Sequence, residues 1–69
     1  MDIYEFVGLL TDDSATIAVW DYTLEEECFC GEAREAAFDW GDYEILSVDI
    51  TPPDKRGISV ILNIETEVD

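Results

Sequence analysis

Residues 43–65 read YEILSVDITPPDKRGISVILNIE, two runs rich in β-branched residues on either side of a segment with Pro, Asp and Gly. Runs of the first kind are typical of strands, and the segment between them, Thr51–Gly57, is typical of a turn. We therefore predict that Tyr43–Ile50 and Ile58–Glu65 form two strands joined by this turn.

Both predicted strands carry apolar side chains at every second position, as a half-buried strand requires. Polar residues alternate with them, such as Ser47 and Asp49 on the first strand and Ser59 and Asn63 on the second. The two apolar rows can share one core. We expect this buried face to consist of Ile58, Val60, Leu62, Ile64, Leu46, Val48 and Ile50.

The first part of the chain also suggests strands. Ile3–Leu10 is apolar on both sides except at Glu5, which favours a strand buried on much of both faces. Thr16–Tyr22 follows after the turn-like residues 11–14, close enough to form an antiparallel hairpin with it.

The middle of the chain contains the one predicted helix. Glu26–Cys30 is expected to be a short strand, although the glutamates before Cys28 would also suit a helix. Glu32–Asp39 has strong helix formers with alanines spaced three and four apart, and Gly41 stops it. Residues 66–69 are expected to fray. The predicted fold is α+β: an antiparallel four- to five-stranded sheet in the order β-β-β-α-β-β, with one short helix.

Length and charge limit the function. The 69 residues make a single small acidic domain, 1–69, which buries only about 60% of the surface of its unfolded chain. A hydrophobic content of 48% is too high for a disordered acidic tail. Eighteen acidic residues against three basic ones and no His give a net charge of −15, whereas about 2 to 8 suits a small soluble domain. Such self-repulsion destabilises the folded domain, and binding to a cationic partner would explain why the chain carries so much charge.

The charge matches DNA in scale. A chain of this length has an expected radius of gyration of about 11 Å, hence a sphere about 28 Å across. Duplex DNA of that length carries about 16 phosphates. Glu25 and Glu27 are expected to present a regular row of carboxylates on one side of a strand. The candidate partner-binding residues are Asp12, Asp13, Glu25, Glu26, Glu27, Glu32, Glu35, Asp39, Asp42 and Glu44.

Metal and cofactor sites have little support. Cys28 and Cys30 stand two apart on a predicted strand, pointing the same way, where a disulfide would be strained, and they are expected to be buried free thiols. No calcium-binding loop motif is present, although Asp12-Asp13 or the Asp39/Asp42 segment could loosely bind a divalent ion. An alternative interpretation is that the acidic residues form only a solvated surface. We expect no cofactor and no metal.

Catalysis and membrane insertion are not expected either. The chain has no His, no Gly-rich phosphate loop and no base beside its serines, so we do not expect an enzyme. It has no run of about 20 apolar residues, and its start lacks the basic region of a signal peptide, which favours a cytoplasmic location.

Size, distributed carboxylates, the strand-helix run Cys28–Ala37 and the closing strands resemble the small acidic inhibitors of phages and mobile elements, in particular anti-CRISPR proteins of the DNA-mimic kind. The resemblance implies an inhibitor that occupies a basic DNA-binding or PAM-reading surface of a Cas effector subunit. Similar mimics target restriction enzymes or uracil-DNA glycosylase. The partner would be a protein, with no direct nucleic-acid binding.

A second interpretation is a non-mimic interaction module or homodimer. It would use an aromatic patch, because aromatic side chains are enriched at interface hot spots, although in a thin core they also serve as packing. The residues of this patch are Trp20, Tyr22, Phe29 and Trp40.

Overall fold

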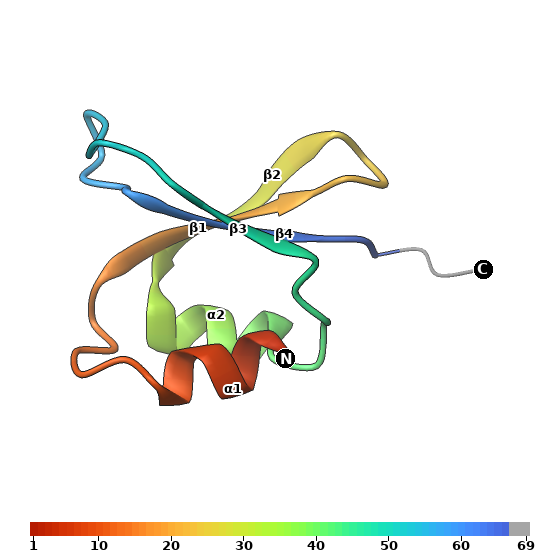
Figure 1. Ribbon diagram of the computed structural model, residues 1–69, viewed down its shortest axis with the longest axis horizontal. Helices are drawn as coiled ribbons and strands as arrows, with labels where there is room; N and C mark the ends of the chain where they lie inside the picture. Colours follow the sequence, from red (N-terminus) through yellow and green to blue (C-terminus); the bar gives the residue numbers. More distant parts are fainter. Residues whose placement is uncertain (67–69) are drawn as a thin grey trace.

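The protein is a four-stranded mixed β-sheet with two helices on one face (Figure 1). The computed structural model describes residues 1–66. In chain order the elements are α1 (Ile3–Gly8), β1 (Thr16–Asp21), β2 (Glu26–Glu32), α2 (Ala33–Trp40), β3 (Ser47–Ile50) and β4 (Val60–Ile64). The predicted α+β class is confirmed. The predictions of a fully antiparallel sheet and of a single helix are wrong.

The sheet has the strand order β2-β1-β4-β3, with a parallel pair at its centre. β1 runs antiparallel to β2, and β3 runs antiparallel to β4, but β1 and β4 are parallel over Ala18–Asp21 and Ile61–Ile64. The chain reaches β4 only after β2, α2 and β3. The predicted hairpin between residues 3–10 and 16–22 is therefore wrong, because β1 forms its hairpin with β2, the strand that follows it in the chain.

The segment predicted as the first strand is helix α1. Asp2 caps it in a capping box: its carboxylate accepts a hydrogen bond from the Glu5 N–H (2.8 Å), and the Glu5 carboxylate accepts one from the Asp2 N–H (3.3 Å). Ile3 and Val7 are buried four residues apart, as on one side of a helix. The apolar positions that suggested a two-sided strand instead make one helical face.

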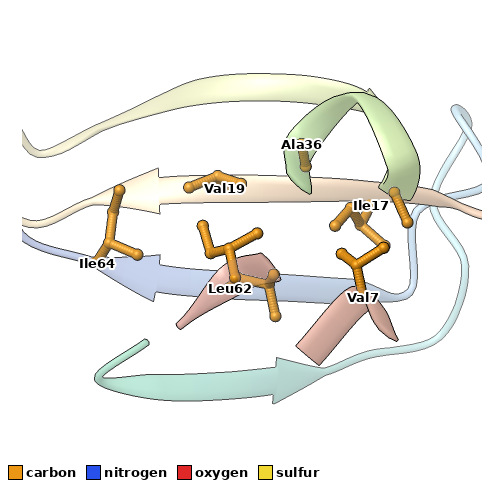
Figure 2. Close-up of a cluster of buried hydrophobic side chains, with 8 residues drawn as sticks. Val7, Ile17, Val19, Ala36, Leu62 and Ile64 are labelled. Carbon is orange, nitrogen blue, oxygen red and sulfur yellow. The ribbon is translucent and has the colours of Figure 1, made fainter. Parts of the chain in front are cut away.

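The core lies between the helices and the two central strands (Figure 2). The inward side chains of β1 and β4 face the buried sides of α1 and α2, and α2 contributes small alanines that let it approach the sheet closely. The buried cluster consists of Ile3, Val7, Ile17, Val19, Ala33, Ala36, Leu62 and Ile64.

The predicted core face is only partly correct. Ile58, Leu62 and Ile64 are buried and Val60 is half-buried, but the row on β3 and just before it is exposed: Leu46 by 52%, Val48 by 38% and Ile50 by 75%. Val48 and Ile50 do lie on the helix face, because they pair with Leu62 and Val60. β3 is the edge strand, however, and the helices leave it uncovered.

Most remaining boundaries agree within a few residues. The predicted strands 16–22, 26–30 and 58–65 correspond to β1, β2 and β4, and the predicted helix 32–39 corresponds to α2. The predicted strand 43–50 is shorter, since only its second half belongs to β3. The fraying expected at the end of the chain falls mainly on residues 67–69, which lie outside the described part.

Replacing Leu62 by Ala should lower the free energy of unfolding by about 2–5 kcal/mol, because it leaves a cavity in a thin core. Ile50→Ala is the matched control and should cost no more than about 0.5 kcal/mol, since that side chain is exposed. Denaturant unfolding measures both. A loss below about 1 kcal/mol for Leu62→Ala would show that the core lies elsewhere.

Candidate partner-binding surface

The ten candidate carboxylates are spread over the molecule and do not form one site. All are exposed except Glu32, which is half-buried. Asp12 and Asp13 lie in the α1–β1 loop, and Glu25 lies in the β1–β2 turn, at opposite ends of the long axis (Figure 1). The rest lie on β2, on α2 and in the connection to β3: Glu26, Glu27, Glu32, Glu35, Asp39, Asp42 and Glu44.

Four of these residues lie on or next to α2: Glu35 and Asp39 are in the helix, Glu32 is its N-cap residue at the end of β2, and Asp42 follows the C-cap residue Gly41. Glu32, Glu35, Asp39 and Asp42 are spaced three, four and three residues apart, which places them on one side of a helix. Ala33 and Ala36 occupy the buried side. The backbone remains α-helical at Gly41 (φ −58°, ψ −31°), so the stripe continues to Asp42. We call these four residues the α2 stripe.

Two arginines already hold two of the ten candidates. Arg34 Nε donates to Glu32 Oε2 at 2.6 Å. Arg56 Nη1 contacts Glu27 Oε2 at 2.7 Å and its Nη2 contacts Asp54 Oδ2 at 3.1 Å, which ties the β3–β4 loop to β2. The hydrogen bonds that Arg56 donates to Glu27 and Asp54 raise the pKa of Arg56 above its ordinary value.

The other candidates are mostly without a cation. Glu44 accepts a hydrogen bond from the ammonium group of Met1 at 3.0 Å. Within residues 1–66, no ion pair involves the remaining seven: Asp12, Asp13, Glu25, Glu26, Glu35, Asp39 and Asp42.

The predicted carboxylate row of Glu25 and Glu27 is wrong. Glu25 lies in the turn before β2 with a positive φ of 53°, and so is not part of the strand alternation. Glu27 is in β2 opposite Trp20, where Arg56 reaches it. The two residues contribute charge to the same end of the sheet without forming a regular array.

The two cysteines are free and do not point the same way as predicted. The β1–β2 register shifts between Val19 and Trp20, which pair with Phe29 and Glu27, so Cys28 is the extra residue of a bulge. Cys28 packs against the core, and burial raises its pKa, whereas Cys30 is exposed. Across residues 1–66 no group of three or more His, Cys, Asp or Glu is placed to hold a metal ion.

The four residues of the suggested aromatic patch do not share a surface. Phe29 and Trp40 pack against the core on the helix side, and Trp40 also contacts Tyr43 with ring centroids 5.4 Å apart. Trp20 pairs with Asn63 and so projects to the opposite face of the sheet. Tyr22 follows β1 and is exposed. Other apolar residues are more exposed, including Phe38 at 90%.

Asp21 is a buried carboxylate that we did not predict. It is fully buried, and its Oδ2 accepts from the Thr66 hydroxyl at 2.7 Å, while its Oδ1 accepts from the backbone N–H groups of Thr23 at 2.8 Å and Thr66 at 3.2 Å. Burial acts to raise the pKa of Asp21, but these hydrogen bonds outweigh it and lower the pKa overall. The sequence did indicate this burial, because Ile17, Val19 and Asp21 occupy alternate positions of β1 and so lie on the same side of the strand, which faces the core.

An open pocket of about 380 Å³ lies where β3 begins and β4 ends. Two of the candidates, Asp42 and Glu44, contribute to its wall. Its lining residues are Asp42, Tyr43, Glu44, Leu46, Glu65 and Thr66. In residues 1–66 there is no helix with the length and apolar character needed to span a membrane.

Asp21 should make stability depend on acid. Its pKa is lower folded than unfolded, so its contribution is complete above the unfolded value of about 3.9 and is lost as the pH falls through the folded value. Asp21→Asn should therefore lower the melting temperature at pH 7, and its difference from the wild type should shrink below about pH 4. Asp39→Asn, an exposed control, should leave the melting temperature unchanged or slightly raised. Equal effects of the two replacements would contradict this role of Asp21.

Added salt should stabilise the protein. At about 10 mM ionic strength the Debye length of about 30 Å spans almost the whole molecule, whose longest extent is 33 Å, whereas at 150 mM it is about 8 Å. Repulsion among the carboxylates is then screened, so the melting temperature should rise by several degrees. A flat or falling melting temperature across this range would indicate that the charges are already compensated.

Comparison of the chain with protein-family models, with curated proteins and with solved structures found no match. The function proposed below is therefore drawn from the fold, the charges and the exposed surfaces of the chain itself.

Proposed function

We propose that this domain is a DNA mimic that binds a basic nucleic-acid-binding surface of a host defence complex and keeps target DNA away from it. The observation that carries the proposal is the wide spread of exposed carboxylates, most of which have no cationic partner within residues 1–66. A rigid body with such a surface offers a basic groove what a phosphate backbone offers. The proposed action is binding alone, and it uses no catalytic group.

The charge density supports the proposal in magnitude. Residues 1–66 hold all three basic residues and every carboxylate except Glu67 and Asp69, so their formal net charge is −13. Over the longest extent of 33 Å this is about one net charge per 2.5 Å, compared with about one per 1.7 Å in duplex DNA. The protein is thus somewhat less dense in charge than DNA, yet far denser than an ordinary small domain.

The α2 stripe gives part of this charge a regular spacing. Successive carboxylates, three or four residues apart, are separated by about 4.5–6 Å along the helix axis. Phosphates along one DNA strand rise by about 3.4 Å each. The stripe can therefore contact a row of basic side chains that follows a strand of DNA, with one carboxylate for about 1.3–1.8 phosphates.

The resemblance to DNA-mimic anti-CRISPR proteins makes a Cas effector subunit the first partner to test. A PAM-reading surface is basic and accessible before target DNA binds, as the proposed mechanism requires. A restriction enzyme and uracil-DNA glycosylase are the next candidates. The protein would act in the cytoplasm of the infected bacterium, where these partners are found.

The proposal predicts competition with DNA. Binding of labelled target DNA to a Cas effector complex should fall as this protein is added, and more steeply at low than at moderate salt. An exposed ion pair contributes about 0.2–1 kcal/mol, so each single Lys replacement in the α2 stripe should weaken inhibition less than about fivefold. The triple variant Glu35→Lys, Asp39→Lys, Asp42→Lys should weaken it by about tenfold or more.

A second triple variant tests the distribution of the charge. Charge reversal of Glu25, Glu26 and Glu27 should also weaken inhibition more than any one change does, although reversing Glu27 additionally breaks its contact with Arg56. Replacing the same three glutamates by Gln removes their negative charges without adding positive ones, and is the control for the charge reversal. Unchanged DNA binding by a partner saturated with this protein would refute mimicry and leave an interaction module that acts elsewhere on its target.

A further inference from the structure

The two edges of the sheet differ in how they are protected. β2 carries Glu26 and Glu27 and a bulge at Cys28, features that discourage pairing with another strand. β3, at the other edge, carries apolar side chains at Val48 and Ile50 that are exposed. Its backbone is therefore the edge more open to an added strand.

The outward backbone groups of β3 belong to its apolar residues. The Thr51 N–H donates to the Ser59 carbonyl at 2.8 Å, toward β4. Inward and outward groups alternate along an antiparallel pair, so the N–H and C=O groups of Ile50 and Val48 point away from β4. No strand lies beyond β3 in the described sheet.

A strand added here would extend the core. Val48 is opposite Leu62 and Ile50 is opposite Val60, all on the helix face of the sheet. On α1, the side turned toward α2 carries Tyr4, whose Cβ would lie 3.2 Å from a Cβ built at Gly41. Phe6, two residues further on, lies about 200° around the helix and thus faces away from α2. An apolar side chain of the added strand would cover Val48 and Ile50, which the helices leave exposed.

The charges near β3 indicate the character of the incoming strand. Asp49 lies on the opposite face of β3, where its Oδ2 accepts from Asn63 Nδ2 at 3.0 Å. Asp42, Glu44 and Glu65 line the pocket beside the start of the strand. A second copy of this chain would bring a net charge of −15 against the same charge. A basic strand is attracted instead.

We propose that the β3 edge pairs with an extended segment of a partner protein in which apolar residues alternate with Lys or Arg. The apolar residues pack on Val48 and Ile50, the basic residues lie on the face of Asp49, and the end of the segment beside the start of β3 reaches the acidic pocket. Pro52 and Pro53 limit pairing beyond one end of β3, so the segment extends toward the pocket. This inference deepens the proposed function and rests on it in one respect, namely that the partner is a basic protein.

The test uses a peptide of about eight residues in which Val and Lys alternate, a typical strand length. Nuclear magnetic resonance with ¹⁵N-labelled protein should show the largest shifts at Val48 and Ile50. A peptide of the same composition with its lysines and valines in two blocks should bind about tenfold more weakly, because it cannot place apolar and basic side chains on opposite faces.

Variants then assign the binding to the edge. Ile50→Lys should weaken peptide binding about tenfold by removing an apolar contact and adding a like charge, with little effect on the fold because the side chain is 75% exposed. Leu24→Lys, an equal charge change at an exposed leucine in the β1–β2 turn, should have much less effect. Ile50→Pro, which removes an outward N–H, should also weaken binding in folded protein.

Three results would overturn the inference. One is equal binding of the alternating and blocked peptides, with shifts spread over the carboxylates. Another is self-association of the protein through β3 that excludes the peptide. The third is full DNA competition by Ile50→Lys, which would leave the mimic function intact and remove the edge from it. Peptide pairing at β3 without DNA competition would instead support the edge and refute the mimic.

Discussion

The parallel pairing of β1 with β4 is the contact on which the rest of this structure depends. It joins segments about forty residues apart and places Val19 beside Leu62, both fully buried, at the centre of the sheet. Closing so long a loop costs entropy that local contacts do not return, so the pair is stable only when α1 and α2 cover it. The helices in turn bury their apolar sides against this pair and against each other. The core, the helices and the sheet therefore depend on one another, and a destabilising substitution at this pair would destabilise all three.

Charge works against this small core. Self-repulsion among the carboxylates favours expansion, and two of the three basic residues are used where they link acidic groups to nearby elements. Asp21 shows that a carboxylate can also hold the fold together, because it is buried with donors from both the β1–β2 turn and the end of β4. Exposed carboxylates such as Glu35, Asp39 and Asp42 make no ion pair within residues 1–66 and hold no element in place. That difference separates the acidic residues that build the domain from those available to a partner.

The two proposed surfaces would contribute differently to one complex. Dispersed carboxylates act at a distance and mainly raise the rate of association, with a strong dependence on salt. Pairing at the β3 edge acts only after contact and mainly slows dissociation, since it adds backbone hydrogen bonds and apolar burial. If the domain displaces DNA as proposed, both effects would contribute to the complex. The acidic pocket lies beside the start of β3, where long-range attraction and short-range pairing would meet.

The sequence by itself determined the class of the fold, the strands β1, β2 and β4, the helix α2 and the excess of exposed carboxylates, because period, propensity and charge are local properties. It also contained α1, in the capping box of Asp2 and Glu5 and in the helical spacing of Ile3, Phe6, Val7 and Leu10, although this short apolar run equally suited a strand. Only the tertiary structure decided that β1 pairs with β4, because pairing between distant strands leaves no local mark. It also decided that Val48 and Ile50 stay exposed: alternation shows which side chains share a face, but the placement of the helices decides how much of that face is covered.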